Sequence, residues 1–345
     1  MLKPTLNLRN IFLFFPILVF ISVIFTYSGR LFARQFNLLM DKPNQRSSHS
    51  SAVPRCGGIS IFFVFICAVS LFLGFDNPLI IGYILGGILI SLVGLLDDII
   101  TLKGVHKIIG MVSASLIPIL FGLRLNYLEI VMHNQLVLCI LTLVWIYGMI
   151  NAFNFMDGID GLIGGVTVVS CLFLMGFGLM GGNYLVTTAA LILMASCFGF
   201  LFFNYSPATV FLGDVGSMFI GYNLAALSIM LVNQSGNQIP IYVCILIFGV
   251  IIFDAMVTFI RRGIEGKNVL AAHREHLYQR LIIIGFSHRD VSIIYYLLSI
   301  TLGVAAVIFF KFTLIIKILV ALLGLLILIL FSFTVCSLEK KYANK

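Results

Sequence analysis

The sequence predicts an all-α polytopic membrane protein, a single domain over residues 1–345 with about eleven transmembrane helices. Of the 345 residues, 61% are hydrophobic and 10% are charged, whereas soluble domains hold about 45–50% and about 25%. The apolar residues form long unbroken runs, and a helix needs about 20 of them to cross about 30 Å of hydrocarbon. Such runs differ from the period-2 segments of about ten residues that mark a membrane β-barrel.

Each apolar run is expected to be a helix, because a backbone in lipid must satisfy its own hydrogen bonds. The first run follows Lys3 and Arg9, as in a secretory signal, but no small-x-small cleavage site comes after it. We therefore expect this run to be retained. Most of the seven cysteines lie in apolar runs without metal-ligand spacing, which predicts small apolar fillers. The runs lie near 11–28, 57–74, 79–96, 106–123, 136–150, 162–180, 184–203, 217–232, 239–260, 291–310 and 312–336.

The distribution of basic residues predicts an orientation in the membrane. Counting Lys107 at a span entrance, one set of loops carries sixteen Lys and Arg, and the opposite side carries five. Because cytoplasmic loops are enriched in these residues, we expect the N-terminus outside and the C-terminus in the cytoplasm. The net charge of +8 then reflects topology and anionic membrane lipids, and nucleic acid is not an expected partner. The basic set consists of 29–56, 97–105, 151–161, 204–216, 261–290 and the tail after Cys336.

The acidic residues gather on the same side. Ten of the thirteen Asp and Glu lie in or next to the cytoplasmic loops, and the external loops are short. Asp254 lies inside a span, about two helical turns before Arg261. Carboxylates at a hydrocarbon boundary are costly to desolvate, so their concentration predicts an active site on the cytoplasmic face.

Three acidic motifs suggest chemistry with phosphates and a divalent cation. Asp97 and Asp98 are adjacent at the end of one span, where a divalent cation or a phosphate would offset their repulsion; a solvated helix end is the alternative. Asp157 and Asp160 share a helical face within Asn151–Leu162, a stretch also rich in Gly and Asn that a plain turn would explain less well. Asp214 follows Gly213 where the eighth span begins, and it would ligate Mg²⁺ or cap the helix.

Two loops carry basic groups that suit a diphosphate. The segment His273–Leu281 combines imidazoles with Arg274 and Arg280, and it is amphipathic enough for a short helix at the membrane surface. An interfacial helix that holds anionic lipid is the alternative. The first inner loop, Asp41–Gly58, combines basic and hydroxyl side chains, so it suits an anion or serves only as a positive-inside loop.

Taken together and in this order, the five segments resemble the polyprenyl-phosphate N-acetylhexosamine-1-phosphate transferases, the family that contains MraY and WecA. The resemblance spans about Asp41 to Arg280. The family pattern Asn-x-x-Asn-Phe-x-Asp-Gly-x-Asp-Gly-Leu stands at 151–162, and Phe-x-Gly-Asp-x-Gly-Ser stands at 211–217. The Asp-Asp pair stands at 97–98.

The resemblance implies a glycosyltransferase family 4 type enzyme of the bacterial cytoplasmic membrane. A UDP-N-acetylhexosamine and undecaprenyl phosphate would give a polyprenyl diphosphate sugar and UMP with Mg²⁺, or Mn²⁺ as an alternative. Such a step would begin O-antigen or other surface glycan synthesis; a homodimer is left open. The implied roles are metal binding for Asp214; catalysis for Asp97, Asp98, Asp157 and His276; nucleotide binding for Asn154, Asp160, Asn204 and Phe211; and phosphate binding for Lys107, Arg274 and Arg280.

The chain departs from the family pattern in two places. Ile99, Ile100 and Thr101 follow the Asp pair where many members carry a third acid or a base. The histidine loop reads His-Arg-Glu-His-Leu-Tyr-Gln-Arg-Leu, which resembles the WbpL-like enzymes more than MraY or WecA. This form implies a deoxy amino sugar donor, with a WecA-like use of UDP-N-acetylglucosamine as the alternative. A transporter is disfavoured because most acids lie at span ends and no repeat is visible.

Overall fold

The computed structural model describes residues 8–41, 52–126, 128, 133–234, 239–268 and 273–343. It is helical apart from two short strands, β1 (Met40–Asp41) and β2 (Val53–Pro54), which pair antiparallel with Met40 opposite Pro54. The helices are α1 (Leu8–Phe36), α2 (Gly57–Leu73), α3 (Pro78–Ile100), α4 (Gly104–Leu120), α5 (Gln135–Phe155), α6 (Leu162–Met180), α7 (Tyr184–Asn204), α8 (Gly213–Gln234), α9 (Ile241–Ile247), α10 (Gly249–Ile264), α11 (Leu277–Ile284), α12 (His288–Lys311) and α13 (Leu314–Ala343).

The prediction of an all-α multi-pass membrane protein is confirmed. Eight of the described helices are long and apolar enough to span a membrane, and a bent pair brings the number to nine. The apolar helices α2 and α4 have 17 residues each, at the lower end of the length that a span needs. Each predicted apolar run is helical, whereas the count of eleven spans and the orientation stay predictions.

The ninth apolar run was predicted to be one helix, and this prediction is wrong. It is broken at Phe248 into α9 and α10, which are inclined by 79°. Phe248 ends α9 by donating its N–H to the carbonyl of Cys244, and its own carbonyl starts α10. Gly249 follows at the break, close to Leu302 of α12. Because the run stays apolar across Phe248 and Gly249, the sequence pattern did not reveal the bend.

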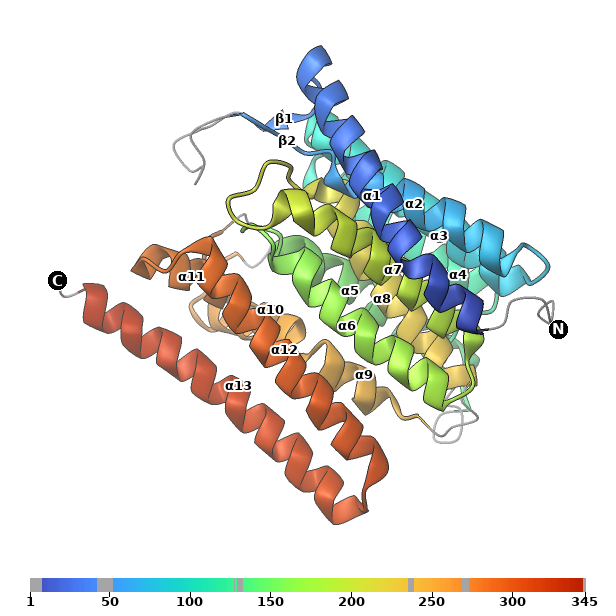
Figure 1. Cartoon of the computed structure of the whole chain (residues 1–345). Helices are drawn as coiled ribbons and strands as arrows, with labels where there is room; N and C mark the ends of the chain where they lie inside the picture. Colours follow the sequence, from blue (N-terminus) through green and yellow to red (C-terminus); the bar gives the residue numbers. More distant parts are fainter. Residues whose placement is uncertain are drawn as a thin grey trace.

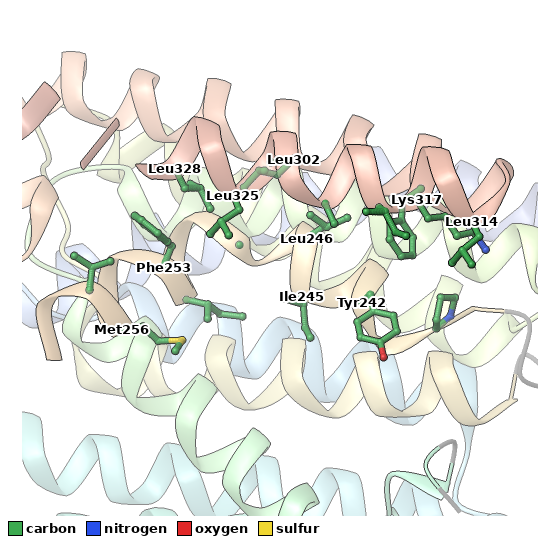
Figure 2. Close-up of a pocket in the computed structure, with 18 of the residues that line it drawn as sticks. Tyr242, Ile245, Leu246, Phe253, Met256, Leu302, Leu314, Lys317, Leu325 and Leu328 are labelled. Carbon is green, nitrogen blue, oxygen red and sulfur yellow. The ribbon is translucent and has the colours of Figure 1, made fainter. Parts of the chain in front are cut away.

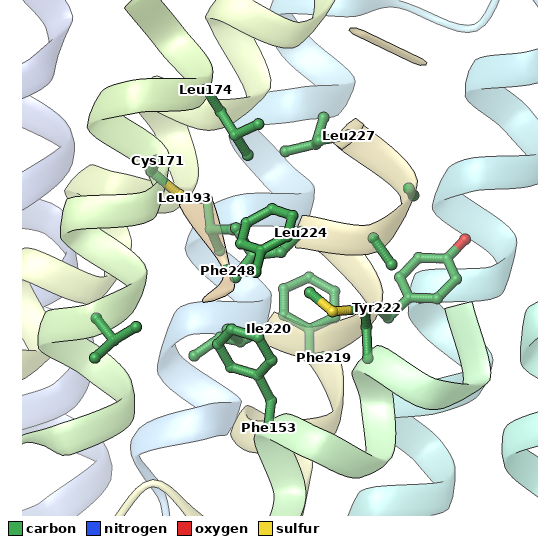
Figure 3. Packing of buried hydrophobic residues seen from close by; sticks show 14 of the residues in the cluster. Phe153, Cys171, Leu174, Leu193, Phe219, Ile220, Tyr222, Leu224, Leu227 and Phe248 are labelled. Carbon is green, nitrogen blue, oxygen red and sulfur yellow. The ribbon is translucent and has the colours of Figure 1, made fainter. Parts of the chain in front are cut away.

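Helix α8 forms the centre of the bundle and is fully buried along its span (Figure 1). Its surroundings are α2, α3, α5, α6, α7 and the short helix α9. Glycines permit the close approach: a Cβ on Gly58 of α2 would lie 2.1 Å from the backbone nitrogen of Gly216, and one on Gly221 would lie 2.7 Å from the carbonyl oxygen of Met149. Small residues at helix contacts let membrane helices pack closely. Around α8, Phe153, Phe219 and Phe248 fill the interior (Figure 3).

The C-terminal helices lie at the edge of this bundle. Helices α12 and α13 form a hairpin, and α13 runs along the outside (Figure 1). A cavity of about 820 Å³ separates α13 from α9 and α10, and its lining is apolar except for a few groups such as Lys317 (Figure 2). This half of the molecule is therefore packed less tightly than the half around α8.

Candidate active site

The start of α8 is held by the Asp pair at the end of α3. Asp98 accepts hydrogen bonds from the backbone N–H groups of Asp214 (3.1 Å) and Val215 (3.2 Å). A carboxylate at a helix N-terminus occupies N–H groups that lack partners within the helix. Gly213 has φ +73° and lies so close that a Cβ there would be 2.8 Å from an Asp98 oxygen. Asp98, from a different helix, thus caps α8, so the side chain of Asp214 is not needed to cap its own helix.

Lys107 of α4 bridges two carboxylates. Its Nζ donates to Asp97 Oδ2 and to Asp214 Oδ2, both at 2.7 Å. Asp97 also accepts the N–H of Leu102 at 2.6 Å, which orients its carboxylate. Helices α3, α4 and α8 therefore meet at one cation between two acids.

Asn154, at the end of α5, completes this acidic centre. Its Nδ2 donates to Asp214 Oδ1 at 2.9 Å and to the Ser217 hydroxyl at 3.0 Å. Because the oxygen and nitrogen of an amide are assigned from such contacts, a rotated side chain would instead present its oxygen to a cation. The centre formed by Asp97, Asp98, Lys107, Asn154 and Asp214 brings together five of the residues predicted from the sequence.

Asp157 lies in the turn after α5 and faces the same centre. Burial raises the pKa of its carboxyl well above the ordinary value of 3.8, and the negative charges of Asp214 and Asp98 raise it further. Arg55, which follows β2, opposes this shift. A carboxyl with such surroundings readily takes up a proton or a cation.

Asp160, three residues later, has a different environment. One of its oxygens accepts the N–H of Ala208 at 3.0 Å, and the other lies 3.4 Å from Nδ1 of His288 on α12. Burial alone would favour its neutral form, but hydrogen bonds from His288 and Ala208 lower the pKa. Its backbone carbonyl accepts the hydroxyl of Ser292 at 2.8 Å. Asp160 therefore joins three segments of the chain.

Asn204 and Phe211 arrange the neighbouring loop. Both ends of the Asn204 amide contact backbone, since its oxygen accepts the N–H of Gly161 and its nitrogen donates to the carbonyl of Val210, each at 3.0 Å. Phe211 is partly exposed, and its backbone bonds Pro54 and Gly57 next to β2. The uracil contacts expected for these two residues stay predictions.

The first inner loop is only partly described. Arg55 pairs with Asp41 at 3.0 Å, so the two strands bring a guanidinium to the edge of the acidic centre. The predicted anion-binding groups Lys42, Arg46 and His49 lie outside the described residues.

The basic loop after α10 is cross-linked by Glu275. This carboxylate lies 2.6 Å from Arg262, 3.2 Å from Arg261 and 3.3 Å from Lys267. Although partial burial opposes the shift, these cations lower the pKa of Glu275. Arg274 is exposed at the start of the segment that leads to α11. Burial, with His276 and Arg262 nearby, lowers the pKa of His273 to about 4.

His276 and Arg280 contact different parts of the molecule. His276 is buried, with Nδ1 at 3.1 Å from Asp254, and its ring lies 6.1 Å from that of Phe155 at the end of α5. Arg280 instead pairs with Glu339 and contacts the sulfur of Cys336, both on α13. His276 therefore lies beside the acidic motif after α5, whereas Arg280 joins α11 to α13. The phosphate contact expected for Arg280 stays a prediction.

Three residues near the site were not assigned roles from the sequence. Arg55 pairs with Asp41 across a loop, and His288 pairs with Asp160, which is distant in sequence; the sequence did not reveal either contact. The position of Asp254 inside a span was a signal, because such acids are usually functional, but its partner could not be named.

The acidic centre has a donor set that suits a hard cation. Oxygens of Asp97 and Asp214 converge on one point, where the Lys107 ammonium now stands. Mg²⁺ is usually held by one or two carboxylates together with waters and substrate phosphates. Among the described residues, no cluster of three or more His, Cys, Asp or Glu has a metal-holding arrangement. A metal bound between Asp97 and Asp214 would therefore need further ligands from water or from substrate phosphates.

Comparisons with known proteins agree with this geometry. Residues 80–232, which include α3, α5 and most of α8, match the model of glycosyl transferase family 4. A Bacillus subtilis protein named probable undecaprenyl-phosphate N-acetylglucosaminyl 1-phosphate transferase is 30% identical over 274 residues, which cover 78% of this chain and 76% of the relative. Undecaprenyl-phosphate alpha-N-acetylglucosaminyl 1-phosphate transferases are 30% identical in Thermotoga maritima (77% of this chain, 84% of the relative) and 29% in Yersinia pestis (89% and 85%).

The matched region contains the Asp pair, Lys107, Asn154 and Asp214, the residues that meet at the acidic centre. This chain therefore belongs to glycosyl transferase family 4 and is a sugar-phosphate transferase of the polyprenyl-phosphate N-acetylhexosamine-1-phosphate type.

Proposed function

We propose that the protein transfers an N-acetylhexosamine-1-phosphate from a UDP-sugar to undecaprenyl phosphate and releases UMP. An oxygen of the lipid phosphate would form a bond to the sugar-bearing phosphorus, and the bond from that phosphorus to the bridging oxygen would break. The electron pair of this bond leaves with UMP, so neither oxidant nor further co-reactant is needed. Phosphoryl transfer is catalysed mainly by positioning and charge neutralisation.

The observation that carries this proposal is the acidic centre with its bridging lysine. Asp214, joined by Asp97, would hold Mg²⁺, which supplies neutralisation of the diphosphate charge when bound. Lys107, once released from the two carboxylates, would donate to a phosphate oxygen of the substrate. Asp98 is occupied by N–H groups of α8, which favours Asp97 as the member of the pair that meets the lipid phosphate.

The remaining residues would surround the donor. Asn154 and Asp157 lie beside Asp214, and the turn that contains Asp160 leads to the segment with Asn204 and Phe211. This neighbourhood supports a uridine site, with the Phe211 ring as a stacking surface. His276 and Arg274 would approach the diphosphate from the other side, because His276 packs against the end of α5.

We infer that the site faces the cytoplasm of a bacterial inner membrane. The acidic centre and the basic loop lie at the same end of the bundle, and the basic residues of the predicted inner loops favour the cytoplasmic side. A soluble nucleotide sugar reaches this end from water, and the lipid phosphate reaches it from the bilayer. The product would begin O-antigen or another surface glycan.

The donor sugar has two candidates. The form of the histidine loop supports a deoxy N-acetylhexosamine, whereas the names of the relatives support N-acetylglucosamine. Purified protein in nanodiscs should be incubated with undecaprenyl phosphate, Mg²⁺ and a panel of UDP-sugars. Mass spectrometry of the lipid identifies the transferred sugar, and EDTA should stop UMP release. If no UDP-sugar gives a lipid diphosphate product, the proposal is wrong.

A further inference from the structure

Asp254 is a carboxylate buried within the membrane-spanning part of α10. Only 1% of the residue is exposed. Helices α10, α11 and α12 meet around it, in the second turn of α10 after the bend at Phe248. The acidic centre does not use Asp254, and the negative charge of a buried acid is stable only when its oxygens accept hydrogen bonds.

The surroundings of Asp254 satisfy this requirement with donors from three directions. Oδ1 accepts the N–H of Leu277 at 2.9 Å and the hydroxyl of Thr258 at 3.3 Å. Oδ2 accepts the hydroxyl of Tyr295 at 2.5 Å and the N–H of Tyr278 at 3.3 Å. The carboxylate thereby occupies two N–H groups at the start of α11 and anchors this helix to α10 and α12.

Nδ1 of His276 contacts the same carboxylate, 3.1 Å from Oδ1. Every other neighbour bonded to Asp254 is a donor, so the carboxylate acts as the acceptor and Nδ1 carries a hydrogen. This assignment leaves Nε2 as the ring nitrogen that can contact a substrate. A carboxylate behind a functional histidine commonly selects the tautomer and fixes the ring in this way.

The histidine that Asp254 fixes lies beside the motif after α5. The His276 ring packs 6.1 Å from the Phe155 ring, and the Tyr278 hydroxyl donates to the carbonyl of Phe155 at 3.0 Å. Tyr278 also covers Gly158, where a Cβ would lie 2.2 Å from its hydroxyl oxygen. The chain linking Asp254 to the site is therefore continuous, from α10 through the start of α11 to the turn that holds Asp157.

We propose that Asp254 is a positioning residue of the transferase, which holds His276 with a hydrogen on Nδ1 and keeps Nε2 for the diphosphate of the sugar donor. This inference rests on the proposed function for the role of His276. It adds a residue that does not itself touch the substrate, and it explains why an acid is retained inside the hydrophobic part of a span.

A double-mutant cycle tests the dependence on His276. Asp254→Asn should lower kcat about 10- to 100-fold with little change in KM for the UDP-sugar, because orientation is lost and binding is not. In a His276→Ala background the same substitution should cause no further loss. Losses that multiply would show that Asp254 acts independently of His276, and would overturn the proposal.

Tyr295→Phe is the matched control. It removes a donor from Oδ2 in the same buried cluster but leaves the contact between Oδ1 and His276. Its kcat should stay close to that of the wild type. An equal loss in Tyr295→Phe and Asp254→Asn would assign the effect to general damage of the cluster and contradict a positioning role.

A spectroscopic measurement separates this inference from the proposed function. Protein labelled with ¹⁵N-histidine in nanodiscs should show a protonated Nδ1 for His276, with the signal assigned by its loss in His276→Gln. Asp254→Asn should reduce the Nδ1–H population. An unprotonated Nδ1 in the wild type would overturn the tautomer assignment, whether or not any UDP-sugar is turned over.

Discussion

The half of the molecule around α8 and the half formed by α9 to α13 hold the site in different ways. In the first half, α8 is fully buried, and glycine contacts bring backbones together, so Asp97, Asp98 and Asp214 sit on rigid helix ends. In the second half, α13 is mostly exposed, a cavity separates it from α9 and α10, and Glu275 cross-links a basic loop. The acidic side of the site is thus positioned by helix packing, and the basic side by polar contacts.

The largest loss of activity is expected from a substitution in the half around α8. Asp214→Asn should lower Mg²⁺-dependent UMP release by about 10²- to 10³-fold or more, because the carboxylate proposed to hold Mg²⁺ is lost, and with it the cation that would neutralise the diphosphate. The fold should persist, because the backbone N–H of residue 214 still donates to Asp98 and the amide oxygen of Asn can still accept from Lys107. Asp290→Asn, at the exposed start of α12, is the control and should retain activity. Full activity of Asp214→Asn would contradict the proposed role of this residue in holding Mg²⁺.

Overpacking the same half should reduce stability. Gly58→Ala places a Cβ 2.1 Å from the Gly216 nitrogen and should lower the free energy of unfolding by about 1–3 kcal/mol, with a parallel loss of activity because α8 shifts. Gly148→Ala has open space around it and should be tolerated. Thermal denaturation in detergent measures both variants. Equal Tm values for the two would mean that close backbone packing does not position α8.

Asp157 and Asp160 lie in the turn between α5 and α6, where the two halves meet. Their pKa values shift in opposite directions, so the two residues should affect stability differently as the pH changes. Asp160, with a lowered pKa, stabilises the fold above its ordinary pKa, and this contribution is lost as the pH falls through the lowered value. Asp160→Asn should therefore cost about 1.5–3 kcal/mol at neutral pH and less in acid.

The effect of Asp157 on stability depends on pH in the opposite direction. Between its ordinary pKa and its raised pKa, the folded protein keeps a proton that the unfolded chain has released, so stability falls as the pH rises. Asp157→Asn should remove this dependence, and its Tm relative to the wild type should increase with pH. Melting curves from acid to neutral pH check both variants. Parallel pH profiles for the two would contradict the difference in their surroundings.

The smallest effect is expected at the edge of the second half. Glu339→Gln removes the partner of Arg280, but the carboxylate is partly exposed, so the loss should be about 0.2–1 kcal/mol with turnover retained. Tm and UMP release measure it. A fall in turnover for Arg280→Gln that Glu339→Gln does not share would support the phosphate contact predicted for Arg280 from the sequence.

The sequence predicted the helices more fully than the contacts between them. Long apolar runs identify spans, because the bilayer imposes their length and composition. The resemblance to the family motifs implied one site for Asp97, Asn154 and Asp214. The cap of α8 by Asp98 could not be derived, since it depends on how α3 crosses α8. The pairing of Arg280 with Glu339 joins residues 59 positions apart, which local patterns do not reveal.

The full burial of α8 has a consequence for how the protein is assembled. Its mean hydropathy of 1.8 is the lowest among the described spans, whereas that of α13 is 3.2. During synthesis, α8 emerges after α2, α3, α5, α6 and α7 and before α9, and these six helices enclose it in the finished protein. Its enclosure is therefore complete only after α9 has joined the bundle. Until α8 has packed against α3, Asp98 has no helix to cap, so the acidic centre forms only when these two helices meet.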